Sequence, residues 1–144
     1  MNLVNSAYPA KLGYRITFYE LGQDEEHGVQ LRPLVSRGRS HRPSTHAQGN
    51  EAFDGMMELL NGSIESTSKS DVRGHDYTSY AQAAVSRGDA LYGVISIDTN
   101  AEIALSESDE ANLTPIADVL AAFFFAADPG NRDQAPEFYS EVQH

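Results

Sequence analysis

The ten residues from Asp71 to Tyr80 bring together most of the side-chain types that do chemistry in this sequence. They include two carboxylates, an arginine, a histidine, two tyrosines and two hydroxyls. Loops of this composition are either solvated turns or sites that hold a polar ligand through a few convergent hydrogen bonds. For a site, we expect contacts from Tyr80 and Gln82, which share one face of the following strand, and from His75 and Tyr77.

The sequence contains no cysteine, which excludes disulfides, thiolate nucleophiles and cysteine-ligated zinc. It also lacks the Gly-x-Ser-x-Gly, His-Glu-x-x-His and Gly-x-x-x-x-Gly-Lys motifs. No nucleophile and base are recognisable as a pair. We therefore expect no catalytic residues, no enzymatic activity and no cofactor.

Three histidines, His41, His46 and His75, are candidates for metal ligands by residue type. A metal site needs three or four convergent ligands with fixed supporting partners, and nothing in this spacing predicts one. We expect these histidines at the surface and no bound metal.

The chain has 21 acidic and 10 basic residues, a net charge of −11. Such a chain repels phosphate backbones and anionic lipid surfaces, so we expect no binding of nucleic acid. Arg37, Arg39 and Arg42 form a basic patch against this background. The patch could receive an anionic ligand or an acidic partner, or it could pair with the protein's own carboxylates, which we favour.

The 144 residues have room for one core of ordinary size. No apolar run approaches the roughly 20 residues of a membrane span, and residues 1–12 lack the pattern of a secretory signal. We expect a soluble, cytoplasmic protein without membrane insertion. Its parts would be a lead-in over residues 1–13 that could include a short helix, one domain over 14–127, and a polar, acidic tail over 128–144.

Alternation of apolar and polar residues predicts two strands, Tyr14–Leu21 with one face buried and Val29–Val35, joined as a hairpin. Pro33 has no N–H for a β-ladder, so the second strand is expected at the sheet edge. A short third strand is expected at Ile64, and a long loop over Ser66–Thr78.

A helix is predicted over Asn50–Leu60 because apolar residues recur there every three or four positions. Methionine fills cores but also suits adaptable pockets. We interpret the apolar face of this helix mainly as core, and include Phe53 and Met57 among the candidate ligand-binding residues.

Two further strands, Ser79–Val85 and Ala90–Asp98, flank a predicted hairpin turn. A helix over Ala111–Ala127 follows, with Ser106 and Asp109 as its capping box. Its expected core stripe is Leu113, Ile116, Leu120, Phe123, Phe124 and Ala127.

This last helix is too apolar for one buried face. It is either sandwiched within the domain or shared with a second copy. We favour a homodimer whose interface contains Phe125, Ala121 and Asp118.

Hairpins at both ends with helices between them predict an α+β fold, a central antiparallel sheet with helices packed on it. This order resembles the GAF family, which is related to PAS domains. The likeness is carried by the strands Ser79-Tyr-Ala-Gln-Ala-Ala-Val85 and Tyr92-Gly-Val-Ile-Ser-Ile-Asp98 and by the helix start Leu105–Glu110 with Ile116–Ala122. It extends from Tyr14 to Ala127. Members of the family usually have a longer helix before the first strand, and with thirteen residues before Tyr14 either that helix is short here or the chain is part of a larger protein.

The resemblance implies a sensory or regulatory domain that binds a small molecule between sheet and helices and pairs through its terminal helix. The free methionine sulfoxide reductases of the family, and its thioether-linked bilin carriers, use cysteines that this sequence lacks. We expect a domain that binds an unidentified small molecule and has no catalytic activity. The alternatives are an interaction or dimerisation module with a closed pocket and, third, an enzyme.

Overall fold

The computed structural model describes residues 8–9, 13–26, 28–40, 42–62, 64–88 and 90–127. The predicted tail over 128–144 and most of the predicted lead-in therefore lie outside the described residues, as does His41.

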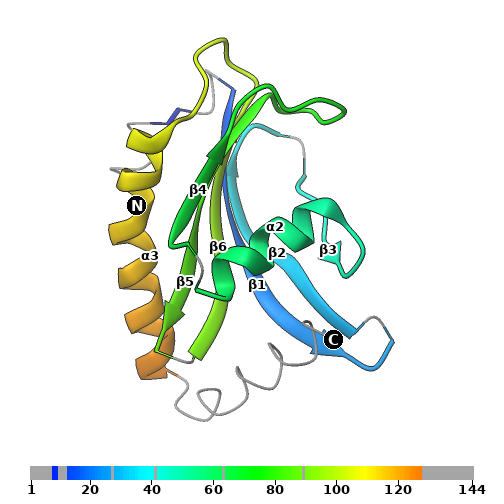
Figure 1. The fold of residues 1–144 in the computed structure, drawn as a ribbon, viewed down its shortest axis with the longest axis vertical. Coiled ribbons are helices and arrows are strands. Elements are labelled where there is room, and N and C mark those ends of the chain that lie inside the picture. The colour runs from blue at the N-terminus through cyan, green and yellow to red at the C-terminus, as the bar shows by residue number, and fades with distance from the viewer. Residues whose placement is uncertain are drawn as a thin grey trace.

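Six strands form a single antiparallel sheet in the order β3-β2-β1-β6-β5-β4 (Figure 1). Two long hairpins build most of it, and they meet where the first strand pairs with the sixth. The predicted α+β class with one antiparallel sheet is confirmed. The strands are β1 (Tyr14–Asp24), β2 (Gly28–Gly38), β3 (His46–Ala47), β4 (Ser66–Lys69), β5 (Ser79–Arg87) and β6 (Ala90–Thr99).

The outer strands differ from the prediction in detail. The third predicted strand at Ile64 is wrong: Ile64 is exposed coil, and the polar segment Ser66–Lys69 pairs with β5 instead. At the other edge, β3 pairs only with Gln30 and Leu31 of β2. The part of β2 from Pro33 onward therefore has no strand neighbour on that side among the described residues, as expected from proline's missing N–H.

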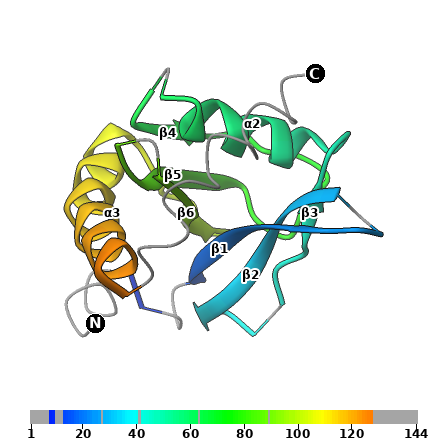
Figure 2. The same cartoon turned by 90° about the horizontal axis from the view of Figure 1, so that it is seen from below.

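Two helices cover opposite faces of the sheet (Figure 2). Helix α2 (Glu51–Leu60) begins at Asn50, whose Oδ1 accepts a hydrogen bond from the N–H of Ala52 at 2.8 Å. Its apolar residues pack on Tyr19, Leu31 and Val94. Because α2 lies on this face, the side of β1 that alternation predicted to be polar is buried as well.

Helix α3 (Glu107–Ala127) covers the other face and packs on β5 and β6. It buries Leu113, Ala117 and Ala121, and its predicted stripe is therefore rotated: Phe123 is 74% exposed. The small alanines let the helix approach Ala81 and Ala83 of β5 closely, which large side chains at the contact would prevent.

The start of α3 shows half of the predicted capping box. The Oδ2 of Asp109 accepts a hydrogen bond from the N–H of Ser106 at 2.8 Å, whereas the hydroxyl of Ser106 contacts that of Ser108. The helix has the length and hydropathy of a membrane span, but one face packs on the sheet and Glu110 accepts hydrogen bonds from two serines of β4. These contacts are those of a helix in a soluble domain.

Candidate functional site

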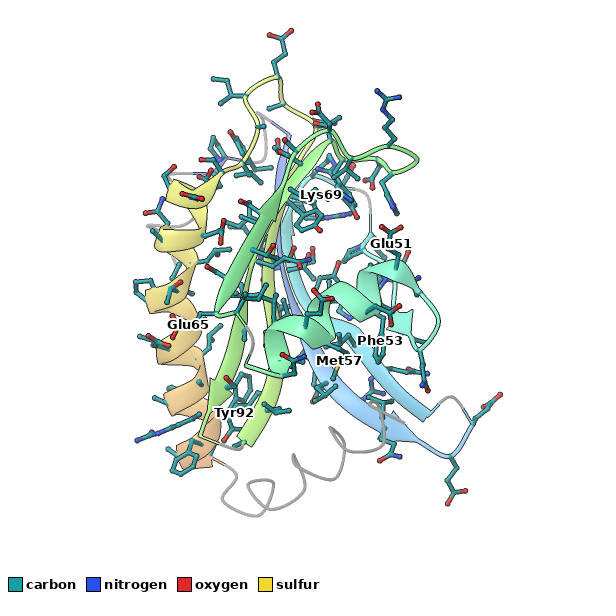
Figure 3. All side chains as sticks on the ribbon, in the orientation of Figure 1. Glu51, Phe53, Met57, Glu65, Lys69 and Tyr92 are labelled. Atoms are coloured by element: carbon teal, nitrogen blue, oxygen red, sulfur yellow. The ribbon has the colours of Figure 1, made fainter. Side chains whose placement is uncertain are left out.

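A cavity of about 370 Å³ lies between the sheet and α2, a size typical of small-molecule sites. We call it the α2 pocket. Strands β1, β5 and β6 form its floor, the first turns of α2 one wall, and residues 69–77 and 42–46 the rest. Figure 3 shows Glu51 at the start of α2 and Lys69 at the end of β4 beside its mouth, where their side chains approach to 4.0 Å.

The floor contains a buried ion pair between neighbouring strands. Arg15 of β1 and Asp98 of β6 are register partners, and they are 2% and 4% exposed. The Nε and Nη2 atoms of Arg15 donate to Oδ2 of Asp98 at 3.0 and 2.8 Å. A charge buried this deeply is stable only when its partner is held in place.

Arg39, just beyond β2, extends this pair into a network. Its Nη2 atom donates to Asp98 and to Asp76, each at 2.8 Å, and its Nη1 atom donates to the carbonyl of Gly13. Burial lowers the pKa of Arg39, but the hydrogen bond to Asp76 and the charge of Asp98 outweigh this and raise the pKa. The network of two arginines and two aspartates is thus charged and internally neutral, and it fixes the 70–78 loop to the sheet.

An aromatic wall follows from the same loop into β5. The rings of His75 and Tyr77 stack with centroids 4.9 Å apart, and Tyr77 meets Tyr80 edge to face at 6.2 Å. Burial, and then the charge of Asp98, raises the pKa of Tyr77 to about 12. Burial, with Glu51 and Glu58, also raises the pKa of Tyr80. Both phenols therefore keep their protons at neutral pH and can donate hydrogen bonds.

His46 adds an unused polar atom to the opposite wall. Its ring lies 5.3 Å from that of Tyr19, and its Nδ1 atom is buried without a hydrogen-bond partner among the described residues. Burial, and secondarily the charge of His75, lowers the pKa of His46. A neutral imidazole with a free nitrogen is suited to a hydrogen bond with a ligand.

Three charged side chains of the lining, Arg42, Arg73 and Asp71, have no ion-pair partner in the described parts of the chain. Asp71 also has a positive φ of 57°, the one such value among the described residues other than glycine. Backbone held in this region costs free energy and is often found at binding sites. The pocket thus offers free charges of both signs.

Four of the six predicted ligand-binding residues line the α2 pocket: His75, Tyr77, Tyr80 and Gln82. Phe53 and Met57 do not. Both lie on α2 with their side chains in the core beneath it, and Phe53 has no exposed surface. Met56, one position away, is the methionine that reaches the lining.

The prediction missed the buried ion pair of the floor, Arg15 and Asp98, and the buried nitrogen of His46. Arg15 was assigned by alternation to the polar face of its strand. The sequence does contain a usable signal. Arg15 lies on the same face of its strand as Tyr19, and a large aromatic side chain is rarely left fully exposed to solvent, so this face is expected to be covered.

Of the histidines, His46 is half-buried rather than at the surface, and His75 is exposed. Across the described residues, no three His, Cys, Asp or Glu side chains come together as metal ligands. Among the three arginines of the basic patch, Arg39 pairs with the protein's own carboxylates, whereas Arg42 lines the pocket.

The residues predicted for a dimer interface do not share an exposed face. Ala121 is 2% exposed and lies in the core, and Phe125 is half-buried with the guanidinium of Arg87 stacked 4.4 Å from its ring centre. Asp118 alone is exposed. The large apolar residues that the described part of α3 exposes are Val119 and Phe123.

The sequence matches no family model and no curated protein. Solved structures do match. The free methionine-R-sulfoxide reductase of Neisseria meningitidis, in complex with its substrate, has 17% identity over 89% of this chain and 75% of its own, with a TM-score of 0.64. The type II enzyme of Thermoplasma acidophilum has 20% identity over 87% and 86%, with a TM-score of 0.62. The GAF domain of a two-component sensor histidine kinase from Bacillus halodurans has 19% identity over 75% and 78%, with a TM-score of 0.53.

These likenesses show that the chain has the GAF fold, as its sequence predicted. They contradict the prediction of a domain without catalytic activity, because enzymes and a sensor domain are both built on this fold. The prediction inferred inactivity from missing motifs. Catalytic groups can be assembled from residues distant in the sequence, which a motif search does not detect.

Proposed function

We propose that this domain binds a small zwitterion, of the size of a free amino acid, in the α2 pocket. The observation that carries the proposal is the presence of free charges of both signs around one cavity. Arg42 and Arg73 are suited to a ligand carboxylate, because guanidinium groups bind carboxylates in a bidentate manner. Asp71 is suited to an ammonium group.

The charge balance of the lining supports a ligand without large net charge. Four basic and four acidic side chains line the pocket, although the whole chain has a net charge of −11. The basic residues are Arg15, Arg42, Lys69 and Arg73, and the acidic ones are Glu51, Asp71, Asp76 and Asp98. An anion would be repelled by the four carboxylates here, and a cation by the four basic groups. A zwitterion can place its carboxylate near basic groups and its ammonium group near carboxylates.

The neutral walls supply orientation. The phenols of Tyr77 and Tyr80 and the Nδ1 atom of His46 offer hydrogen bonds, and the aromatic faces offer contact to an apolar or polarisable side chain. The Neisseria enzyme was solved with its substrate, and its name identifies that substrate class as a free amino acid derivative. This supports the ligand class only. The present chain has no thiol with which to reduce a sulfoxide.

Calorimetric titration with free L-methionine, L-methionine sulfoxide and N-acetyl-methionine amide tests the proposal. The free amino acids are expected to bind, and the capped analogue, which lacks both charges, is not. Mass spectrometry of the same mixtures detects any conversion of the ligand. Equal binding of the capped analogue would contradict the proposal, as would a flat response to all three and to the remaining free amino acids.

Gly55 provides a matched pair of variants. It lines the pocket from the middle of α2, and a Cβ atom built there meets no atom within 4 Å. Gly55→Leu should fill the cavity and abolish binding, whereas Gly55→Ala should retain it. Both should fold at least as stably as the parent, because glycine inside a helix costs about 0.5–1 kcal/mol relative to alanine. Undiminished binding by folded Gly55→Leu would place the ligand elsewhere.

We also propose that α3 pairs with a second copy of the chain, through Val119 and Phe123 rather than the residues first predicted. Both side chains are mostly exposed, and the uncharged residues Pro115, Ala122 and Ala126 are exposed on the same helix. Phe123→Glu should then lower the mass measured by sedimentation, whereas Ile103→Glu, which changes an exposed residue outside α3, should not. A parent protein that sediments as a monomer contradicts this proposal.

A further inference from the structure

A second hollow, of about 680 Å³, lies along the outer part of β2. We call it the arginine hollow, because Arg32, Arg37, Arg39 and Arg42 line it. None of the described residues that line it is acidic. Four of the ten basic residues of a chain with net charge −11 therefore converge on one concave surface.

The charge of the hollow is only partly neutralised. Arg39 is held by Asp76 and Asp98. Arg32 approaches Glu20 at 3.8 Å, but both side chains are about half exposed, so this pair is weak. Arg37 and Arg42 are exposed, and no described carboxylate lies within ion-pair distance of either. The hollow is thus a positively charged surface on a protein with a negative net charge.

The strand that borders the hollow has an open edge. β3 pairs only with Gln30 and Leu31, and within the described residues no backbone hydrogen bond joins residues 40–45 to residues 33–38. Leu34 and Val35 are 54% and 50% exposed on this edge. An open strand edge with exposed apolar side chains accepts an extended peptide.

We infer that the arginine hollow docks a short, extended, acidic segment of a partner protein. Carboxylates of the segment pair with Arg32 and Arg37, and an apolar side chain between them contacts Leu34. A nucleic acid fits less well, because its continuous line of phosphates extends beyond the hollow and is repelled by a chain whose net charge is −11. The charges of a short acidic segment, by contrast, all lie within the arginine hollow.

Fluorescence anisotropy with a labelled hexapeptide of alternating glutamate and valine tests this inference. The peptide is expected to bind, more weakly as salt is added, whereas the same peptide with glutamine for glutamate should not. The double variant Arg32→Gln/Arg37→Gln should bind about tenfold more weakly or worse. Arg87→Gln, which changes an exposed arginine at the far hairpin, should bind like the parent.

Three results would overturn the inference: equal binding of the glutamine peptide, unchanged binding by the folded double variant, or tighter binding of a single-stranded oligonucleotide through the same arginines. The test is independent of the α2 pocket. Neither Arg32 nor Arg37 lines that pocket, so the double variant should bind the zwitterion like the parent.

Discussion

Replacing Asp98 with alanine removes a carboxylate that two arginines share. Oδ2 of Asp98 accepts two hydrogen bonds from Arg15, and Oδ1 accepts one from Arg39. Arg39 keeps Asp76 as a partner and is nearer to solvent. Arg15 is 2% exposed, and its contact to Asp76, at 3.7 Å, is longer than either of its hydrogen bonds to Asp98. The cost of the variant therefore falls mainly on Arg15.

Leaving one member of a buried ion pair without its partner costs about 3–5 kcal/mol. The remaining attraction of Asp76 places the expected loss for Asp98→Ala at the lower end, about 3 kcal/mol. For a chain of this length that corresponds to a fall in melting temperature of about 10 °C. Asp118→Ala, which removes an exposed aspartate of α3, should change the free energy of unfolding by less than about 0.5 kcal/mol.

Urea unfolding followed by circular dichroism measures both variants. A third variant, Arg15→Met/Asp98→Leu, separates charge from packing, because replacing a buried pair by apolar residues is often nearly neutral. It should recover most of the stability lost in Asp98→Ala. A loss below about 1 kcal/mol for Asp98→Ala would show that Arg15 is solvated in the folded protein and refute the reasoning. An equal loss in the double variant would attribute the effect to packing.

Further predictions concern other parts of the fold. Because burial lowers the folded-state pKa of His46, the unfolded chain takes up the proton first as the pH falls through 6.5. The free energy of unfolding should therefore decrease as the pH falls through this value, and His46→Gln should reduce that loss in urea titrations. Gly93→Ala should lower the free energy of unfolding by about 2 kcal/mol or more, and with it the melting temperature, because the φ of Gly93 is +157° and a Cβ atom there would collide with the carbonyl of Tyr19. A variant as stable as the parent would contradict the spacing of β1 and β6. Glu110→Ala removes the acceptor of two β4 hydroxyls, so amide hydrogen exchange should accelerate in β4 but not in β6; uniform protection would show that the contact does not hold this edge.

The elements that could be predicted are those whose evidence lies within a few neighbouring residues. Alternation located both hairpins, and the spacing of Phe53, Met56 and Met57 located α2. The edge strand Ser66–Lys69 has no apolar pattern, because it is anchored through serine hydroxyls to α3. The sequence therefore indicated a loop there.

The rotation of α3 and the charged half of the pocket depend on contacts between distant residues. The predicted buried stripe of α3 follows its largest side chains and includes Phe123. In the structure the small residues Ala117 and Ala121 face the sheet instead. Arg15 and Asp98 are 83 positions apart, and only the pairing of β1 with β6 makes them partners. Alternation places Arg15 on a polar face, and only the position of α2 makes that face the floor of a pocket.

The sheet divides the interior of this domain into two compartments that share strands but not side chains. Phe18, Ile95 and Ile97 pack on the α3 side, whereas Tyr19, Ser96 and Asp98 beside them in sequence line the pocket on the α2 side. Substitutions that change ligand binding on the α2 side thus leave the side-chain packing between α3 and the sheet unchanged. That packing can keep the strands in register. The two halves can therefore diversify at different rates, and a library randomised at the pocket lining, with Arg15, Asp76 and Asp98 kept, should retain a folded scaffold.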